Sequence, residues 1–337
     1  MNRINWIDNL RGMSILAVIL LHSTIAVNGD AGHFSALTET LNQLLAPVRL
    51  GLMFFVSGLF VDAGLKKGFS PFLNNKVKSI LYPFAIWTVI YGGLKIAFSS
   101  LANTPQSPLN IIVMHLSGGG DITWFLHSLF MFFIVIVVVR HLPVWVVLPA
   151  FWLASYFLPA IDADSLFSSF DNAHINKSLY LFIFFYLGDL LVRKQTAIPQ
   201  MASSGTVLTL SLISFALLSL LNLSMRASPD QALLTPLALL SVPLFIWLAM
   251  KSRSRLVCYV GVNSIVFYLS HYLAIQFFSK VVRLEGTSPW IHDVKFVLAF
   301  LAALAMPWTL CLLRQRGWFN FLFSLKQPKQ RAGMKTV

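Results

Sequence analysis

Ten apolar stretches of 15–23 residues, placed as membrane-spanning segments, constrain the fold of this chain more than any other feature. A transmembrane helix needs about 20 predominantly apolar residues, and 57% of the 337 residues are hydrophobic while 11% are charged. Polar interruptions bound the stretches, which cover residues 11–28, 43–65, 79–101, 122–139, 143–160, 178–192, 203–223, 232–250, 256–278 and 294–313. We therefore expect an all-α fold, a polytopic membrane bundle of about ten transmembrane helices.

Lysine and arginine gather in alternate connections between these stretches and predict the orientation of the chain. If the N-terminus is cytoplasmic, 18 of the 25 lysines and arginines fall in cytoplasmic segments. Cytoplasmic loops of membrane proteins carry such an excess, so we expect both termini in the cytoplasm. This bias also explains the net charge of +13, and no nucleic-acid partner is predicted. Residues 1–325 are expected to form one membrane domain, and the basic segment 326–337 a cytoplasmic tail against anionic lipid.

The composition gives no support for a metal centre or a disulfide framework. Both cysteines, Cys258 and Cys311, lie in predicted spans, which argues against either use of cysteine. The chain has no zinc-type ligand spacing, no phosphate-binding glycine loop and no internal repeat. We therefore expect no metal cofactor.

The first apolar stretch carries an arginine near its start and a histidine well inside it. Arg11 and His22 are eleven positions apart, so on a helix both lie on one stripe, roughly 16 Å apart along the axis. An ionisable group deep in a membrane marks a functional site by default. Asp8 precedes Arg11 by three residues and is placed to orient it. Two simpler interpretations stay open: Arg11 as an interfacial anchor and His22 as a hydrogen-bond partner between helices.

Further ionisable residues fall inside the predicted spans. They are Arg49, Lys95, His127 and His271. Counting 1.5 Å per residue from the nearest cytoplasmic charge places all of them in the outer half of the membrane, with His271 roughly 24 Å above Arg255. Together with Arg11, this layout predicts a tunnel with two mouths. Arg49 and Lys95 can instead snorkel outward, and His127 and His271 can serve as plain hydrogen-bond partners between helices.

Four segments, in this order, resemble the signatures of acyltransferase family 3 membrane proteins. DNLRG at residues 8–12, with the apolar run to His22, resembles the first-helix signature. MFFVSGLF at 53–60 resembles the second signature, WFL at 124–126 the third, and SIVFYLSH at 264–271 the late segment that ends in a histidine. The family often has a carboxylate near Gly51 and a histidine just before WFL, both absent here. Arg49 is more like the periplasmic-glucan branch of the family; a common-antigen polymer is another candidate acceptor.

The resemblance implies an integral membrane O-acyltransferase of the bacterial cell inner membrane. It would move an acetyl or other short acyl group from cytoplasmic acyl-coenzyme A, usually acetyl-CoA, to a hydroxyl of an envelope carbohydrate at the periplasmic side. The implied partners are acyl-CoA, an envelope glycan or lipid-linked saccharide, and membrane lipid. The competing prediction is a transporter or flippase of lipid-linked sugar, because intramembrane histidines and arginines also mark substrate paths.

Each candidate residue receives an expected role in that chemistry. Arg11, with Asp8, is expected to bind the coenzyme A phosphates. His22 is the expected general base on the acceptor hydroxyl, because the pKa of histidine suits proton transfer near neutral pH. A transient acyl-histidine is the alternative route. The remaining candidates are Arg49, His271 and Trp124 as oxyanion donors, and Trp124 and His127 as further cofactor-binding residues.

Overall fold

The computed structural model describes residues 5–28, 36–98, 107–116, 120, 122–158, 172–224, 233–281 and 289–325. These ranges are helical and contain no strand. The helices are α1 (Asn5–Asn28), α2 (Ala36–Gly58), α3 (Val61–Leu65), α4 (Phe69–Lys76), the π-helical η1 (Val77–Leu81), α5 (Tyr82–Ala97), α6 (Pro108–Leu116), α7 (Trp124–Val139), α8 (Val144–Phe157), α9 (Asn172–Arg193), α10 (Ile198–Ser203), α11 (Gly205–Ser224), α12 (Thr235–Lys251), α13 (Arg255–Val262), α14 (Ser264–Val281), α15 (Pro289–Gln315) and the 3₁₀ turn η3 (Asn320–Leu322). The predicted tail 326–337 lies outside the described residues.

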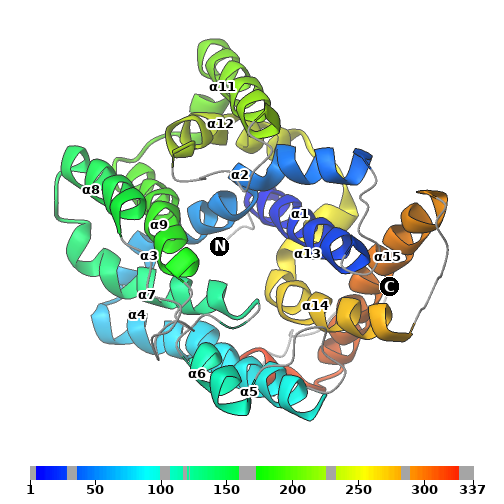
Figure 1. The fold of residues 1–337 in the computed structure, drawn as a ribbon. Coiled ribbons are helices and arrows are strands. Elements are labelled where there is room, and N and C mark those ends of the chain that lie inside the picture. The colour runs from blue at the N-terminus through cyan, green and yellow to red at the C-terminus, as the bar shows by residue number, and fades with distance from the viewer. Residues whose placement is uncertain are drawn as a thin grey trace, which may run out of the picture.

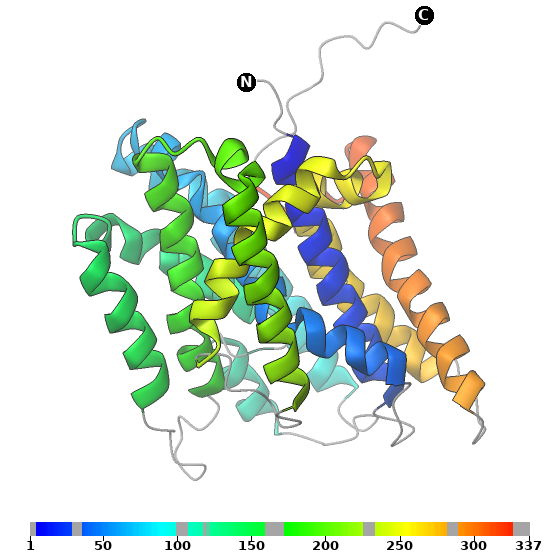
Figure 2. The same cartoon turned by 90° about the horizontal axis from the view of Figure 1, so that it is seen from above.

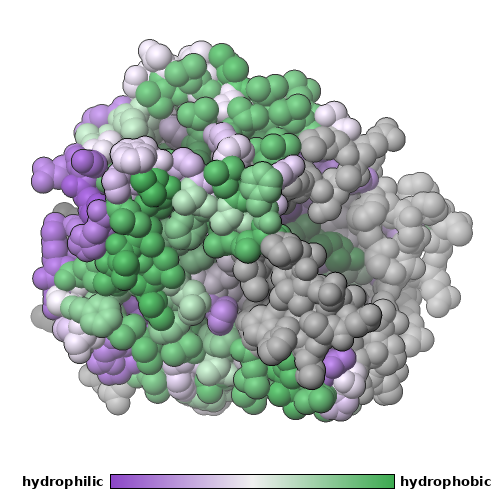
Figure 3. Space-filling model, turned by 60° about the vertical axis from the view of Figure 1, so that its left-hand side comes forward, coloured by the Kyte–Doolittle hydropathy of each residue, from purple (hydrophilic) through white to green (hydrophobic). Residues whose placement is uncertain are grey.

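The described helices include several that are long and apolar enough to cross a membrane. Five qualify on their own, namely Asn5–Val27, Thr38–Leu65, Phe69–Ala97, Gly205–Ser224 and Trp290–Gln315, and a sixth qualifies if the bent pair α12 and α13 is one span. Figure 3 shows hydrophobic residues over much of the described part of one face, as a lipid-facing surface requires. The all-α membrane fold is confirmed, whereas the count of ten spans and the cytoplasmic termini stay predictions.

The predicted span 256–278 is divided between two helices. α13 ends at Val262, Asn263 leaves the helical conformation with φ −104° and ψ 23°, and α14 begins at Ser264. The amide of Asn263 donates to the carbonyl of Tyr259 at 3.0 Å. The axis also turns by 115° between α12 and α13. The one straight helix expected for 256–278 is therefore replaced by α13 followed by α14.

α1 and α2 form the middle of the bundle (Figure 1). α1 packs against α2, α12, α13, α14 and α15, and α2 also packs against α9 and α11. Of their apolar windows, 56% and 67% are buried, against 22% for α15. Pro47 lies inside α2; an internal proline removes a backbone hydrogen bond and bends a helix. In the view of Figure 2, the first part of α2 runs obliquely to α1.

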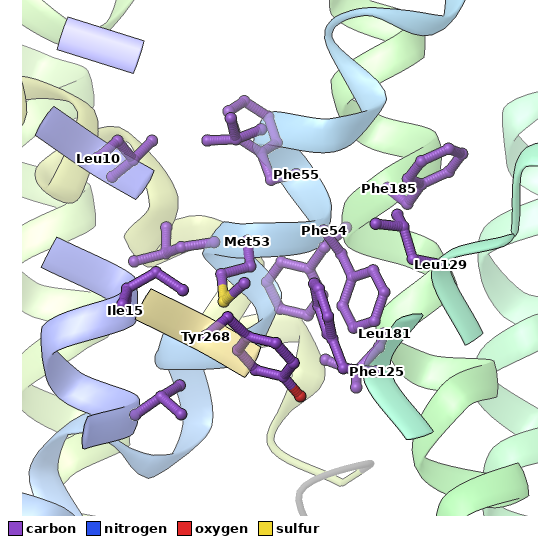
Figure 4. Close-up of a cluster of buried hydrophobic side chains, with 14 of the residues drawn as sticks. Leu10, Ile15, Met53, Phe54, Phe55, Phe125, Leu129, Leu181, Phe185 and Tyr268 are labelled. Atoms are coloured by element: carbon purple, nitrogen blue, oxygen red, sulfur yellow. The ribbon is translucent and has the colours of Figure 1, made fainter. Parts of the chain in front are cut away.

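Aromatic side chains fill the space between α2, α7, α9 and α14 (Figure 4). The ring of Phe54 lies 4.6 Å from that of Phe125 and 4.8 Å from that of Phe132. Phe125 also contacts the ring of Tyr268 at 4.9 Å, and the Tyr268 hydroxyl donates to the carbonyl of Ile122 at 2.6 Å. This hydrogen bond satisfies the one polar atom of a buried aromatic residue. It fixes α14 against the start of α7.

Two pairs of glycines let helices cross at backbone contact. A Cβ atom at Gly12 would lie 2.9 Å from the carbonyl carbon of Val257, and one at Gly261 would lie 2.7 Å from that of Asp8. Gly58 and Gly188 allow the same close backbone approach where α2 crosses α9. Small residues allow such close approach in membrane proteins. The glycines of the DNLRG and MFFVSGLF motifs therefore serve helix packing.

A buried cluster of ion pairs joins α3, α9 and the end of α7. Arg140 lies 2.9 Å from Asp62 and 3.3 Å from Asp189, and Arg193 lies 2.7 Å from Asp189. Asp189 has no exposed surface. A carboxylate in an apolar interior needs such partners. Arg140 and Arg193 were predicted only as cytoplasmic loop charges, but each is bonded inside the fold.

Candidate functional site

The first helix carries both of the residues on which the predicted site depends. Arg11 and His22 lie on α1, which continues unbroken from Asn5 to Asn28, so the predicted separation of roughly 16 Å along the axis applies. Arg11 forms an ion pair with Asp8 at 3.8 Å, as predicted, and its guanidinium lies 5.8 Å from the ring centre of Phe60.

The beginning of α1 is attached to the corner between α12 and α13. The amide of Asn9 donates to the carbonyls of Ala249, at 2.9 Å, and Ser252, at 3.1 Å. These carbonyls belong to the end of α12, where helical backbone acceptors lack partners within the helix. Together with the close approach at Gly12, the two hydrogen bonds fix the position from which Arg11 extends.

The ring of His22 lies against two residues of α14. Its centre is 5.3 Å from that of His271 and 5.2 Å from that of Tyr272, which it meets edge to face. Tyr272 in turn lies 6.0 Å from Tyr91, whose hydroxyl donates to the carbonyl of Leu269 at 2.7 Å. Helices α1, α5 and α14 therefore meet at one group of imidazole and phenol rings.

His271 lies beside His22, a contact that counting residues along the sequence did not predict. The count assumed one straight helix from Arg255, whereas α13 stops at Val262 and a new helix starts at Ser264. The residues of α13 therefore do not add their full rise to the height of His271.

Arg49 is buried, with 6% of its surface exposed, and its described contacts stay near its own helix. Its guanidinium donates to the side-chain oxygen of Asn42 at 3.2 Å and to the Asn42 carbonyl at 3.4 Å. Asn42 donates to the hydroxyl of Thr24 at 2.7 Å, and the hydroxyl of Ser14 donates to the Arg49 carbonyl. Arg49 thus lies inside the bundle between α1 and α2, with its guanidinium directed back along α2 toward Asn42, and the alternative of a side chain snorkelling outward stays a prediction.

Trp124 and His127 lie on α7, toward the end opposite Arg140. Trp124 is the first residue of that helix and is 8% exposed, and the ring of His127 lies 5.6 Å from that of Phe84. Sixteen residues of helix separate Trp124 from Arg140, a rise of about 24 Å. Arg140 pairs with Asp62, which is close in the chain to Phe60, and the ring of Phe60 contacts Arg11. The end of α7 at Arg140 therefore lies near Arg11. A ligand that touches both Arg11 and Trp124 must be extended.

Apolar side chains fill the stripe of α1 between Arg11 and His22. Ile15 is fully buried and Val18 is 3% exposed, both within the hydrophobic core. A slender acyl-carrying arm that runs from Arg11 toward His22 must therefore pass beside these side chains.

Tyr272 and Tyr91 were not predicted from the sequence, because tyrosine is common in apolar helices and no spacing sets these two apart. Asp189 was also missed, although an aspartate inside the predicted span 178–192 is itself a signal, since a charge in a membrane is costly. Among the described residues, no group of three or more metal-ligating side chains lies together.

The arrangement suits proton transfer to or from a small polar group. Two imidazoles next to each other in a buried site can accept, hold and return a proton without a metal ion. The guanidinium of Arg11, which pairs with Asp8 on the same helix, can bind an anionic group by a two-pronged contact. Proton transfer at His22 and anion binding at Arg11 are therefore separated by the length of three helical turns.

Comparison with known proteins identifies the family. No curated protein and no solved structure matches the chain. A family model described as an acyltransferase domain matches residues 4–316, nearly the whole chain and all four sequence signatures. With the apolar helices, this match makes the chain a multi-pass membrane protein of the acyltransferase type, and it belongs to acyltransferase family 3.

Proposed function

We propose that this protein is an O-acyltransferase that moves an acetyl or other short acyl group from acyl-coenzyme A to a hydroxyl of an envelope carbohydrate. The observation that carries the proposal is the contact of His22 with His271 and Tyr272 in the interior, on the same helix as the Arg11–Asp8 pair. The family match supports acyl transfer; the donor, the acceptor and the side of the membrane are the proposal.

The donor end of the proposed site is Arg11. Coenzyme A carries phosphate groups at one end and the thioester at the end of a long, slender arm. A guanidinium binds phosphate through paired hydrogen bonds, and Asp8 holds the guanidinium from one side at 3.8 Å. The roughly 16 Å rise from Arg11 to His22 suits an arm extended along α1. Trp124 and His127, farther along the bundle, are the proposed contacts for the acyl end.

The transfer step takes place at His22. Its ring nitrogen takes the proton of the acceptor hydroxyl while the hydroxyl oxygen attacks the thioester carbonyl. The resulting tetrahedral oxyanion is stabilised by Arg49 or Trp124. The carbon–sulfur bond then breaks, and the proton passes from His22 to the departing thiolate. General-base catalysis of this kind contributes about 10²- to 10⁴-fold.

The bias of lysine and arginine supports the proposed orientation in a bacterial inner membrane, with acyl-CoA reaching Arg11 from the cytoplasm and the carbohydrate arriving from the periplasm. The rival function is transport of a lipid-linked sugar. Transport needs two compartments, whereas acyl transfer proceeds in a detergent micelle.

The test is acyl transfer by the purified protein in detergent, with acetyl-CoA as donor and release of free thiol as the readout. Wild type should release thiol, and His22→Gln should lose the activity at equal protein level. A wild-type protein that leaves acetyl-CoA intact in the presence of envelope carbohydrate, or a His22→Gln variant with wild-type turnover, would overturn the proposal. A labelled acetyl group retained on denatured protein would identify the acyl-histidine route instead of direct transfer.

A further inference from the structure

His271 has one ring nitrogen whose role is fixed by the backbone. Its Nδ1 lies 2.9 Å from the carbonyl oxygen of Phe267, one turn earlier on α14. A carbonyl oxygen can only accept a hydrogen bond, so Nδ1 carries the hydrogen. In the neutral ring the other nitrogen, Nε2, therefore carries a lone pair and acts as an acceptor.

This acceptor is buried without a donor. His271 has no exposed surface, and its Nε2 makes no hydrogen bond with the described residues. Buried polar atoms are almost always satisfied in native proteins, and an exception calls for an explanation. The rings described around His271 are those of Tyr268, whose hydroxyl is already bonded to Ile122, and His22. Of these, His22 offers a ring N–H.

The separation of the two imidazoles fits a hydrogen bond between them. Each ring nitrogen lies roughly 1.1 Å from its ring centre, so nitrogens aimed along the 5.3 Å line between the centres would lie about 3 Å apart, the length of a hydrogen bond. The rings are now inclined by 46°. For the hydrogen bond to form, the His22 ring must turn its N–H toward the lone pair of His271.

We propose that His271 is a positioning residue for His22, and this inference rests on the proposed acyl transfer. The Nε2 of His271 accepts the N–H of His22 and so leaves the opposite nitrogen of His22 free of hydrogen, facing the acceptor hydroxyl. When the hydroxyl O–H bond breaks, its proton moves to that nitrogen, and the oxygen forms the new bond to the thioester carbon. The carbon–sulfur bond then breaks, and the thiolate takes the same proton. His271 keeps its own hydrogen throughout.

This role differs from the oxyanion donor expected from the sequence. A neutral His271 with Nδ1–H committed to Phe267 has no hydrogen on Nε2 to offer to an oxyanion. The contact with His22 makes it comparable to the third member of a catalytic triad, which selects the tautomer of the base and stabilises its protonated form.

A second buried histidine provides a matched control. His115 on α6 is 2% exposed, and its Nδ1 lies 2.8 Å from the carbonyl of Ile111, also one turn earlier. Its ring lies beside Gly92 and Gly120. If a buried histidine of this geometry is needed only for the structure, substitution should have the same effect on activity at both positions.

The experiment compares His271→Gln, His271→Asn, His115→Gln and His22→Gln, purified in detergent, by thiol release from acetyl-CoA. Glutamine can place an acceptor oxygen where Nε2 stood, whereas asparagine replaces only Nδ1 and can still donate to Phe267. We expect His271→Asn to lower kcat by about 100-fold with an unchanged KM for acetyl-CoA. We expect His271→Gln to recover activity to within about tenfold of wild type, and His115→Gln to behave as wild type.

Wild-type kcat in His271→Asn would overturn the inference, as would equal losses in the asparagine and glutamine variants. A loss in His115→Gln as large as that in His271→Asn would assign both histidines a structural role. In each of these cases the proposed acyl transfer stands, provided that His22→Gln is inactive. If wild type releases no thiol, or His22→Gln retains full activity, the proposed function itself fails, and the positioning role with it.

Discussion

The crossing of α1 and α13 gives the most direct structural prediction. In Gly261→Ala, the new Cβ atom would lie 2.7 Å from the carbonyl carbon of Asp8 and 2.9 Å from the amide nitrogen of Gly12. Ordinary non-bonded contacts are about 3.5–4.0 Å, and the carbonyl oxygen of Asp8 lies nearer still, so the two helices must move apart by more than about 1 Å. All of these obstructing atoms belong to the backbone, and no side chain can rotate away.

Overpacking of this kind costs about 1–3 kcal/mol. With an unfolding entropy of about 2.1 cal/mol/K per residue, a change of 1 kcal/mol shifts the melting temperature of this 337-residue chain by about 1.4 °C. We expect Gly261→Ala to melt about 1–4 °C below wild type in detergent. The displaced helix carries Arg11 and His22, and a misplacement of about 1 Å can cost 100-fold in rate. Acyl transfer should therefore fall further than stability alone would explain.

The matched control is Gly93→Ala, because an added Cβ at Gly93 on α5 meets nothing within 4 Å. Alanine is favoured over glycine inside a helix by roughly 0.5–1 kcal/mol, so this variant should melt at or above the wild-type temperature. The reasoning is refuted if both alanine variants melt together, or if Gly261→Ala keeps wild-type stability and turnover.

Two further substitutions test the end of the bundle that carries Arg11. Asp189→Ala removes the carboxylate that lies 3.3 Å from Arg140 and 2.7 Å from Arg193. Because this breaks a buried ion pair, the free energy of unfolding should fall by about 3–5 kcal/mol. An unchanged denaturation midpoint would contradict this expectation. Arg11→Lys keeps the charge but loses the two-pronged contact, so the KM for acetyl-CoA should rise about tenfold with kcat little changed; a fall in kcat alone would argue against a binding role.

Local patterns on single helices were predictable from the sequence. The placement of Arg11 and His22 on one helix follows from periodicity alone, and the Asp8–Arg11 pair follows from a three-residue spacing that the structure confirms. The apolar stretches predicted the helical membrane class because backbone groups in lipid must be bonded within the segment.

Contacts between distant parts of the chain were not predictable. The neighbourhood of His22 and His271 depends on the break at Asn263, and one residue that leaves the helical conformation gives no strong signal in an apolar sequence. The sequence places Gly58 in the MFFVSGLF motif without indicating a role, and its function in packing emerges only when α9 is seen to cross at Gly188.

The measurement that tests the central claim most directly is mass spectrometry of the envelope glycans of cells that carry wild-type protein, His22→Gln or no protein. Wild type should add an acyl mass, 42 Da per site for acetyl, to one class of glycan, and His22→Gln at equal protein level should give the unmodified spectrum of cells without the protein. Full acylation in the His22→Gln cells would contradict a reaction centred on that imidazole.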